Sequence, residues 1–137
     1  MFSIPRLGAI NLHSGKAPTY RGAAPAFWEL FNGEHEVGIT IHRVTAELDA
    51  GTILIQETFP LDPAPAGDPL AYLERYRAEV LEPHGIRLVA EAVGRIAAGT
   101  AVDTPQDTTQ ARTWRSPNHA AVRELRRRVR ERRKAPA

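Results

Sequence analysis

The sequence of 137 residues contains no cysteine, which excludes disulfide bonds and thiolate metal sites and favours a cytoplasmic protein. It also contains no apolar run near the ~18 residues needed to span a bilayer. The first residues, MFSIPRLG, lack the apolar segment of a secretory signal. With 42% hydrophobic and 25% charged residues, the composition argues against disorder and suits one domain with a core rather than two.

The charge is unevenly distributed along the chain. Residues 123–134 carry eight basic and two acidic groups, whereas the rest of the chain carries ten basic and fourteen acidic groups. The formal net charge of +2 therefore comes from a basic tail on a mildly acidic body. For this reason the net charge alone does not indicate a nucleic-acid-binding protein.

Hydrophobic periodicity predicts an α/β fold. The expected elements are a strand at 9–13, a loop at 14–25, a short helix at 26–32, strands at 37–44 and 52–59, a long helical stretch from Asp68 to Gly99, and a final helix beginning at Ser116-Pro117. Pro83 should kink the long stretch or divide it into two abutting helices. Three strands are few for a sheet that must cover so long a helix.

One group of polar residues is suited to acyl transfer. Asn11 and His13 lie two apart on a predicted strand, so their side chains point to the same side, and Asp49 lies in a later loop beside Gly51. An imidazole moves protons near neutral pH, an amide N–H donates to an oxyanion, and a carboxylate orients and charges the imidazole. The alternative is that Asn11 and His13 cap a turn and that Asp49 caps its own loop.

Five ordered blocks between Leu7 and Gln56 resemble the formyltransferase family, which includes methionyl-tRNA, glycinamide ribonucleotide and sugar N-formyltransferases. The blocks are GAINLH from Gly8, P-x-Y-R-G-A-A-P from Pro18, WELFNGE from Trp28, VGITIH from Val37 and LDAGTILIQ from Leu48. The resemblance implies a Rossmann-like fold, here a partial one with a few-stranded sheet, a long helix and a basic C-terminal helix.

The resemblance also implies an activity, the transfer of a formyl group from 10-formyltetrahydrofolate to an amine. By motif, the family's catalytic residues fall on Asn11, His13 and Asp49. Asn11 and protonated His13 would stabilise the oxyanion, while Asp49 would keep His13 charged and relay a proton.

The loop after His13 departs from the family's usual Pro-Ser-Leu-Leu-Pro pattern. It reads Ser14-Gly15-Lys16-Ala17-Pro18, but Tyr20, Arg21 and Gly22 keep the family pattern. Lys16, Tyr20, Arg21 and Gly22 are the expected substrate-binding residues. Alternatively, Lys16 is simply solvated and Arg21 anchors the loop. His42 is interpreted as structural, and no metal site is expected, because the other histidines have no partners at metal-ligand spacing.

The resemblance implies that the chain corresponds to the second half of a catalytic domain, over residues 1–115, followed by a basic helical tail at 116–137. The folate-binding half would precede Met1. Such a chain is expected to form a homodimer or bind a partner chain that completes the domain; alternatively, it is a truncated, non-catalytic subunit or fragment. Nucleic acid binding through the 123–134 tail is a weaker alternative, and a small amine such as an amino sugar nucleotide is favoured over methionyl-tRNA as acceptor.

Overall fold

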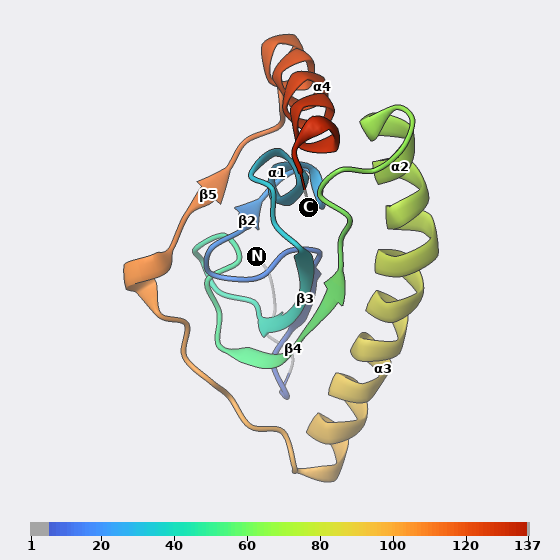
Figure 1. Cartoon of the computed structure of the whole chain (residues 1–137). Coiled ribbons are helices and arrows are strands. Elements are labelled where there is room, and N and C mark those ends of the chain that lie inside the picture. Colours follow the sequence, from blue (N-terminus) through green and yellow to red (C-terminus); the bar gives the residue numbers. More distant parts are fainter. Residues whose placement is uncertain (1–5, 137) are drawn as a thin grey trace.

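The computed structural model, which describes residues 6–136, has an antiparallel three-stranded sheet covered by a long helical layer (Figure 1). The strand order is β1-β3-β4, with β1 at Ile10–His13, β3 at Glu36–Arg43 and β4 at Ile53–Pro60. The three predicted strands are present, and the α/β fold class is confirmed. A short helix α1, Phe27–Phe31, precedes β3 as expected.

The central strand β3 is buried on both faces over residues 37–42. On one face, Ile39 and Ile41 belong to the hydrophobic core beneath the helices. On the other face, the loop after β1 lies directly on the strand: a β-carbon on Gly38 would come within 2.7 Å of the Lys16 side chain. Thr40 Oγ1 donates to the Gly15 carbonyl at 2.8 Å, which fixes the loop onto the sheet.

The long helical layer is continuous, and it widens before the proline. Helix α2, Pro69–Tyr76, leads through a π-helical turn, Arg77–Leu81, into α3, Glu82–Ala98. The Glu82 N–H donates to the Arg77 carbonyl five residues earlier. Pro83 has no N–H to donate, so this wider turn accommodates the interruption predicted from the sequence. The helix ends, as predicted, before Gly99, which adopts φ 71°.

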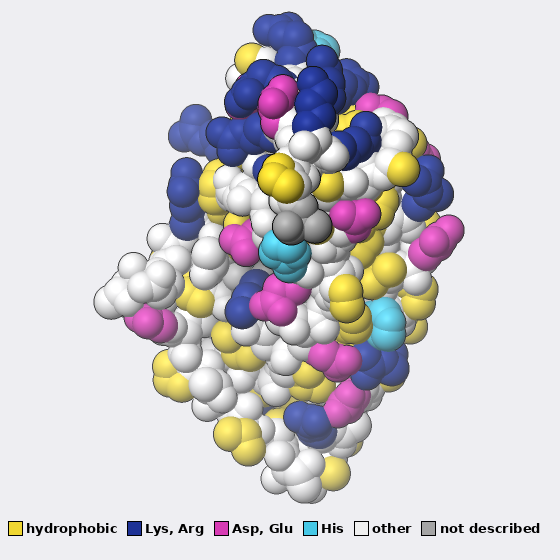
Figure 2. Space-filling model, viewed as in Figure 1, with side chains coloured by type: hydrophobic (Ala, Val, Ile, Leu, Met, Phe, Trp, Pro, Cys, Tyr) yellow, Lys and Arg dark blue, Asp and Glu magenta, His cyan; other side chains and the backbone are white. Residues whose placement is uncertain are grey.

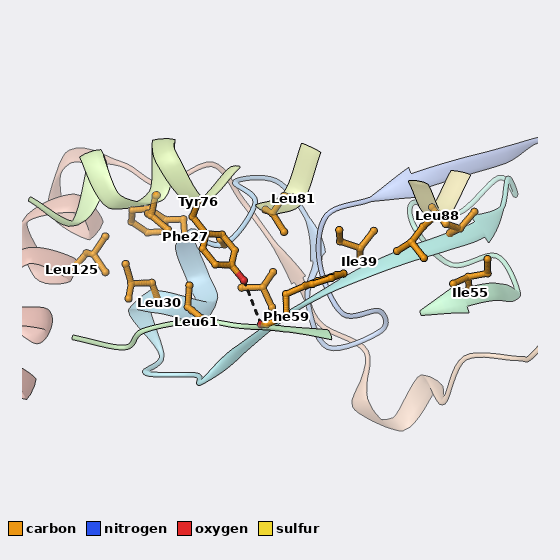
Figure 3. Close-up of a cluster of buried hydrophobic side chains, with 14 of the residues drawn as sticks. Phe27, Leu30, Ile39, Ile55, Phe59, Leu61, Tyr76, Leu81, Leu88 and Leu125 are labelled. Atoms are coloured by element: carbon orange, nitrogen blue, oxygen red, sulfur yellow. Dashed lines mark hydrogen bonds between the residues drawn. The ribbon is translucent and has the colours of Figure 1, made fainter. Parts of the chain in front are cut away.

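The core forms one contiguous cluster along the inner side of this helical layer (Figure 3). Tyr76 is anchored within it, because its hydroxyl donates to the Pro60 carbonyl at 2.9 Å. At one end of the cluster Leu125 of the C-terminal helix lies near α1, and at the other end Leu88 of α3 covers β3 (Figure 3).

The segment after α3 returns across the molecule and adds a second, two-stranded sheet. Strand β5, Thr113–Trp114, pairs in parallel with β2, Arg21–Gly22, within the stretch predicted to be a loop. A short 3₁₀ helix, Thr108–Gln110, immediately precedes β5 in the chain. Two-residue strands carry no periodicity, which explains why the sequence pattern did not reveal them.

The basic C-terminal helix α4, His119–Lys134, is packed against α1. Leu125 and Val129 are fully buried, and Arg132 donates to the carbonyls of Leu30 and Phe31, at the end of α1, at 2.7 Å each. Figure 2 shows Lys and Arg side chains gathered over this helix. The division of the chain after residue 115 stays a prediction. Within residues 6–136, no helix combines the length and apolar character needed to cross a membrane.

Candidate active site

The structure brings His13 and Asp49 together. His13 ends β1, and Asp49 lies in the loop between β3 and β4; His13 Nδ1 is 3.4 Å from Asp49 Oδ2. Both side chains are buried, with 8% and 6% of their surface exposed. The two groups are therefore placed to form an ion pair when the imidazole is protonated.

The second nitrogen of His13 contacts the chain itself. His13 Nε2 donates to the Tyr20 carbonyl. Because a carbonyl oxygen only accepts, Nε2 carries a proton in this geometry, and Nδ1 is the nitrogen that faces the Asp49 carboxylate. Gly15 makes this geometry possible, because a β-carbon there would lie 2.5 Å from both His13 Nε2 and the Tyr20 carbonyl oxygen.

Asn11 reaches Asp49 through His42, a strand residue for which the sequence predicts a structural role. Asn11 pairs with His42 across the β1–β3 ladder, and its Nδ2 lies 3.4 Å from His42 Nε2. His42 Nε2 is also 3.3 Å from Asp49 Oδ1. The carboxylate of Asp49 therefore lies between two imidazoles, and His42 joins the predicted trio as a fourth member. The pairing of two antiparallel strands is the signal that would have revealed it.

Asp49 is held in an unusual backbone conformation by polar groups from two other segments. Its φ is 50°, in the left-handed region. The Gly22 N–H donates to Asp49 Oδ2 at 3.0 Å, and Gln106 Nε2 donates to the Asp49 carbonyl at 2.7 Å. Gln106 lies 57 residues away in sequence, and no motif pointed to it.

The four predicted substrate-binding residues have different surroundings. The Gly22 amide contacts Asp49, whereas Arg21 is only 5% exposed and donates to Gln106 Oε1 at 2.9 Å. Lys16 is exposed and pairs with Glu36 at 3.3 Å. The substrate-binding role of all four stays a prediction.

Tyr20 is also buried, and its ring and its hydroxyl both have partners. Its ring stacks on Trp114 with centroids 5.6 Å apart, and its hydroxyl donates to Glu34 at 2.9 Å. Burial raises the pKa of Tyr20 to about 12, so the hydroxyl stays protonated at neutral pH. Tyr20 and Lys16 line a hollow together with Glu29, Glu34 and other residues. Neither of them lines the cavity that Asn11 and Asp49 share.

A cavity of about 240 Å³ opens beside the site. Asn11, His42 and Asp49 line it, and Val44 and Leu48 belong to its rim with more than half of their surfaces exposed. A polar floor with an apolar rim suits a small planar ligand with hydrogen-bonding edges. Within residues 6–136, no group of three or more histidines and carboxylates is arranged to hold a metal ion.

Comparison with known proteins gives this geometry a family. Residues 1–80 match the formyl transferase family model. The methionyl-tRNA formyltransferase of Chlorobium chlorochromatii is 39% identical over 111 residues, which are 81% of this chain and 33% of that protein. The corresponding enzyme of a Synechococcus species is 35% identical over the same length, 32% of that protein. The chain thus spans about a third of the length of these relatives.

Solved structures share the fold. An N-formyltransferase from Helicobacter canadensis, crystallised with folinic acid and dTDP-3-aminofucose, superposes with a TM-score of 0.62 at 20% identity, covering 88% of this chain and 46% of that one. HypX from Aquifex aeolicus, in complex with tetrahydrofolic acid, also has a TM-score of 0.62, with 27% identity over 82% of this chain and 18% of that one. Since the family model matches more than half of its residues, the chain belongs to the formyl transferase family.

Proposed function

We propose that this chain supplies the catalytic residues for transfer of a formyl group from 10-formyltetrahydrofolate to an amine. The observation that carries the proposal is the Asp49 carboxylate, 3.4 Å from His13 Nδ1 and 3.3 Å from His42 Nε2, with Asn11 beside it at the cavity. The set combines a neutral donor, a charged imidazole and a carboxylate, which formyl transfer to nitrogen requires.

Each residue has a defined task in this reaction. Folate, when bound, presents the formyl group on nitrogen, and the acceptor amine adds to its carbon while the bond to the folate nitrogen breaks. Asn11 Nδ2 donates to the oxygen that becomes negative. Asp49 keeps His13 protonated and relays the amine's proton towards the departing folate nitrogen. For His13 Nε2 to donate to the same oxygen, that oxygen must take the position of the Tyr20 carbonyl.

The cavity fits the formyl-bearing end of the donor and little more. Its volume of about 240 Å³ lies below the ~300 Å³ at which pockets for whole small molecules begin. The rest of the folate would need surfaces contributed by another polypeptide segment.

The edge of the sheet formed by β1 is the candidate surface for that segment. β1 lies at the sheet edge, and the Val44 N–H donates to the Ala9 carbonyl, so in this antiparallel register the backbone of Ile10 and Leu12 faces away from β3. Hollows of about 480 and 220 Å³ flank this edge, and the exposed side chains Ile86 and Val93 line one each. An edge strand with apolar neighbours is suited to pairing with a strand.

We infer that the occupant of this edge is an α/β polypeptide that adds a strand to β1 and completes the fold. The support is the length comparison, because relatives of the same family are about three times as long as the matched region. Light scattering on the purified chain tests this inference, with Ile86→Asp as the variant. A dimer that Ile86→Asp dissociates would instead make a second copy the occupant. A monomer that binds the region preceding the matched one in the Chlorobium relative would support the inference, and failure to bind it would overturn it.

The proposed acceptor is a small amine such as an amino sugar nucleotide, and methionyl-tRNA is the second candidate. A sugar nucleotide is present in the Helicobacter structure, whereas the relatives at 35–39% identity are methionyl-tRNA enzymes. Against the tRNA candidate, Arg128, Arg132 and Arg133 of the basic helix bind carbonyl groups within the chain and are not free for phosphate. Formylation assays with both acceptors distinguish the two.

The experiment that tests the function is calorimetry with folinic acid, followed by a formyl-transfer assay, on the chain alone and with its completing partner. Binding at millimolar ligand together with turnover supports catalysis. Binding only with the partner supports a composite enzyme. Absence of folate binding in both preparations would favour the alternative, a non-catalytic subunit of the same fold.

A further inference from the structure

We propose that Arg21 and Gln106 form a strap that positions Asp49 between His13 and His42. The two side chains act as positioning residues, since they contact the Asp49 loop and each other rather than the cavity. This inference rests on the proposed function, because it concerns the residue that charges His13.

Gln106 is bonded in a way that leaves only one orientation for its amide. Its Nε2 donates to the carbonyls of Asp49 and Gly51, at 2.7 Å each. Its Oε1 accepts from Arg21 Nε at 3.2 Å and from Arg21 Nη2 at 2.9 Å. If the amide were reversed, its N–H groups would face the Arg21 guanidinium and its oxygen would face two carbonyl oxygens, so these hydrogen bonds could not form. The two bonds on either side of Ala50 therefore fix the path of the loop.

The loop that contains Asp49 needs these hydrogen bonds to keep its conformation. Residues 44–48 are exposed, so few contacts hold them, and Asp49 itself adopts φ 50°. A non-glycine residue in the left-handed region is strained and persists only when its surroundings enforce that conformation. Gln106 reaches the backbone of Asp49 and supplies that enforcement.

Arg21 joins the strap to the other anchor of Asp49. It is only 5% exposed, and its Nη1 also reaches Glu47, two residues before Asp49, at 3.4 Å. The next residue, Gly22, donates its N–H to the Asp49 carboxylate. The Arg21-Gly22 dipeptide thus holds this loop at two points. The Gly22 N–H binds the Asp49 carboxylate, and the Arg21 guanidinium binds Glu47. The strand pairing of β2 with β5 fixes that dipeptide in turn.

The strap predicts a long-range effect on protonation. Without Gln106 the loop can relax towards ordinary backbone angles, which moves the carboxylate away from His13 Nδ1. The Tyr20 carbonyl then remains as the polar neighbour of this imidazole, and a neutral carbonyl stabilises a positive charge less than a carboxylate does.

The test is an NMR titration of the imidazole nitrogens in the intact chain for Gln106→Ala, with Gln110→Ala as control. Gln110 lies four residues away, is exposed, and uses only its backbone in the contacts described. The titration midpoint of His13 should move to lower pH by at least half a unit in Gln106→Ala and stay within 0.2 units of the parent in Gln110→Ala, as order-of-magnitude expectations for a lost charge contact. Equal midpoints in the two variants would overturn the strap.

A second variant guards against loss of folding. Gln106→Met keeps about the length of the side chain and removes both donors to the loop without adding a charge, so its His13 midpoint should move in the same direction. In an active preparation, Gln106→Ala should lower kcat about tenfold or more and leave the KM for the acceptor within twofold. If the midpoint moves but the parent shows no formyl transfer, the strap stands and the proposed function fails.

Discussion

His42 Nε2 lies 3.3 Å from Oδ1 of Asp49, the carboxylate oxygen that His13 does not face. His42 Nδ1 already donates to the Arg43 carbonyl at 2.9 Å. A neutral His42 therefore accepts at Nε2, where the Asn11 amide can donate, and a charged His42 donates at Nε2 to Asp49. The protonation of His42 thus decides which neighbour it holds, and this links the orientation of Asn11 to the charge of the Asp49 carboxylate.

The first prediction separates the two histidines. His13→Ala should lower formyl transfer by about 10²–10⁴-fold, the range for loss of a proton-transferring group, while folinic acid affinity stays within a few-fold. His42→Asn should lower the rate less, by about tenfold, and alter the pH dependence of kcat/KM. Rate measurements across pH 5.5–8.5 check both. Turnover of His13→Ala at the parental rate would remove His13 from the mechanism.

The second prediction concerns Gly15. A β-carbon at this position would lie 2.5 Å from His13 Nε2, so Gly15→Ala must displace either the imidazole or the loop. We expect loss of activity comparable to that of His13→Ala, with near-native circular dichroism. Gly94→Ala is the control, because a β-carbon there meets nothing within 4 Å. In the middle of α3 it should stabilise the fold by about 0.5–1 kcal/mol. Parental activity in Gly15→Ala would show that the loop can move away from the added methyl group without displacing His13.

The sequence predicted the local parts of this site and missed the distant ones. Asn11 and His13 share a face because strand side chains alternate, and the D-x-G loop was recognisable by its motif. His42 needed the register of β1 against β3, a tertiary fact. Gln106 reaches the site only because the segment after α3 turns back across the sheet, and no local pattern encodes that return.

The same division holds for the fold. Strand and helix periodicity identified the long elements, and the glycine after Ala98 marked the helix end correctly. The π-helical turn at Arg77–Leu81 depends on how the helix adapts to Pro83 while its apolar face stays on the sheet. The pairing of β2 with β5 joins residues about 90 positions apart, and two residues per strand give no periodic signal.

The third prediction is a pH dependence of stability caused by Glu29. Its side chain is buried, and burial raises its pKa to about 7, with the nearby Glu34 adding to the effect. The folded state then binds a proton more tightly than the unfolded state, whose value is the ordinary 4.5. The contribution of Glu29 is therefore fully present below pH 4.5, and stability falls as pH rises from 4.5 to 7.

Glu29→Gln removes this dependence. The variant should match the parent near pH 4.5 and exceed its free energy of unfolding by about 2–3 kcal/mol at pH 8. Urea unfolding at the two pH values measures it. The exposed neighbour Glu34→Gln should show a smaller difference. A Glu29→Gln effect that is the same at both pH values would mean that the carboxylate is not protonated in the folded chain.

The basic helix calls for a different kind of variant from a deletion. Removing residues 123–137 would also remove Leu125 and Val129, both fully buried, so the loss of any RNA binding would be confounded with unfolding. Nucleic acid binding by this tail stays a prediction. Glutamine at the exposed positions Arg123, Arg130 and Lys134 lowers the positive charge and spares the core. RNA affinity that persists unchanged in this triple variant would exclude these three side chains as the phosphate contacts.

The fourth prediction assigns the structural work of that helix to Arg132. Its guanidinium donates to the carbonyls of Leu30 and Phe31 at the end of α1, and to the Pro63 carbonyl at 3.0 Å. Arg132→Ala should therefore lower the free energy of unfolding by about 1–3 kcal/mol, the range for hydrogen bonds to a charged donor. Arg123→Ala, exposed on the same helix, should change it by less than about 0.5 kcal/mol. Equal effects of the two substitutions in urea unfolding would mean that α4 is held by Leu125 and Val129 alone.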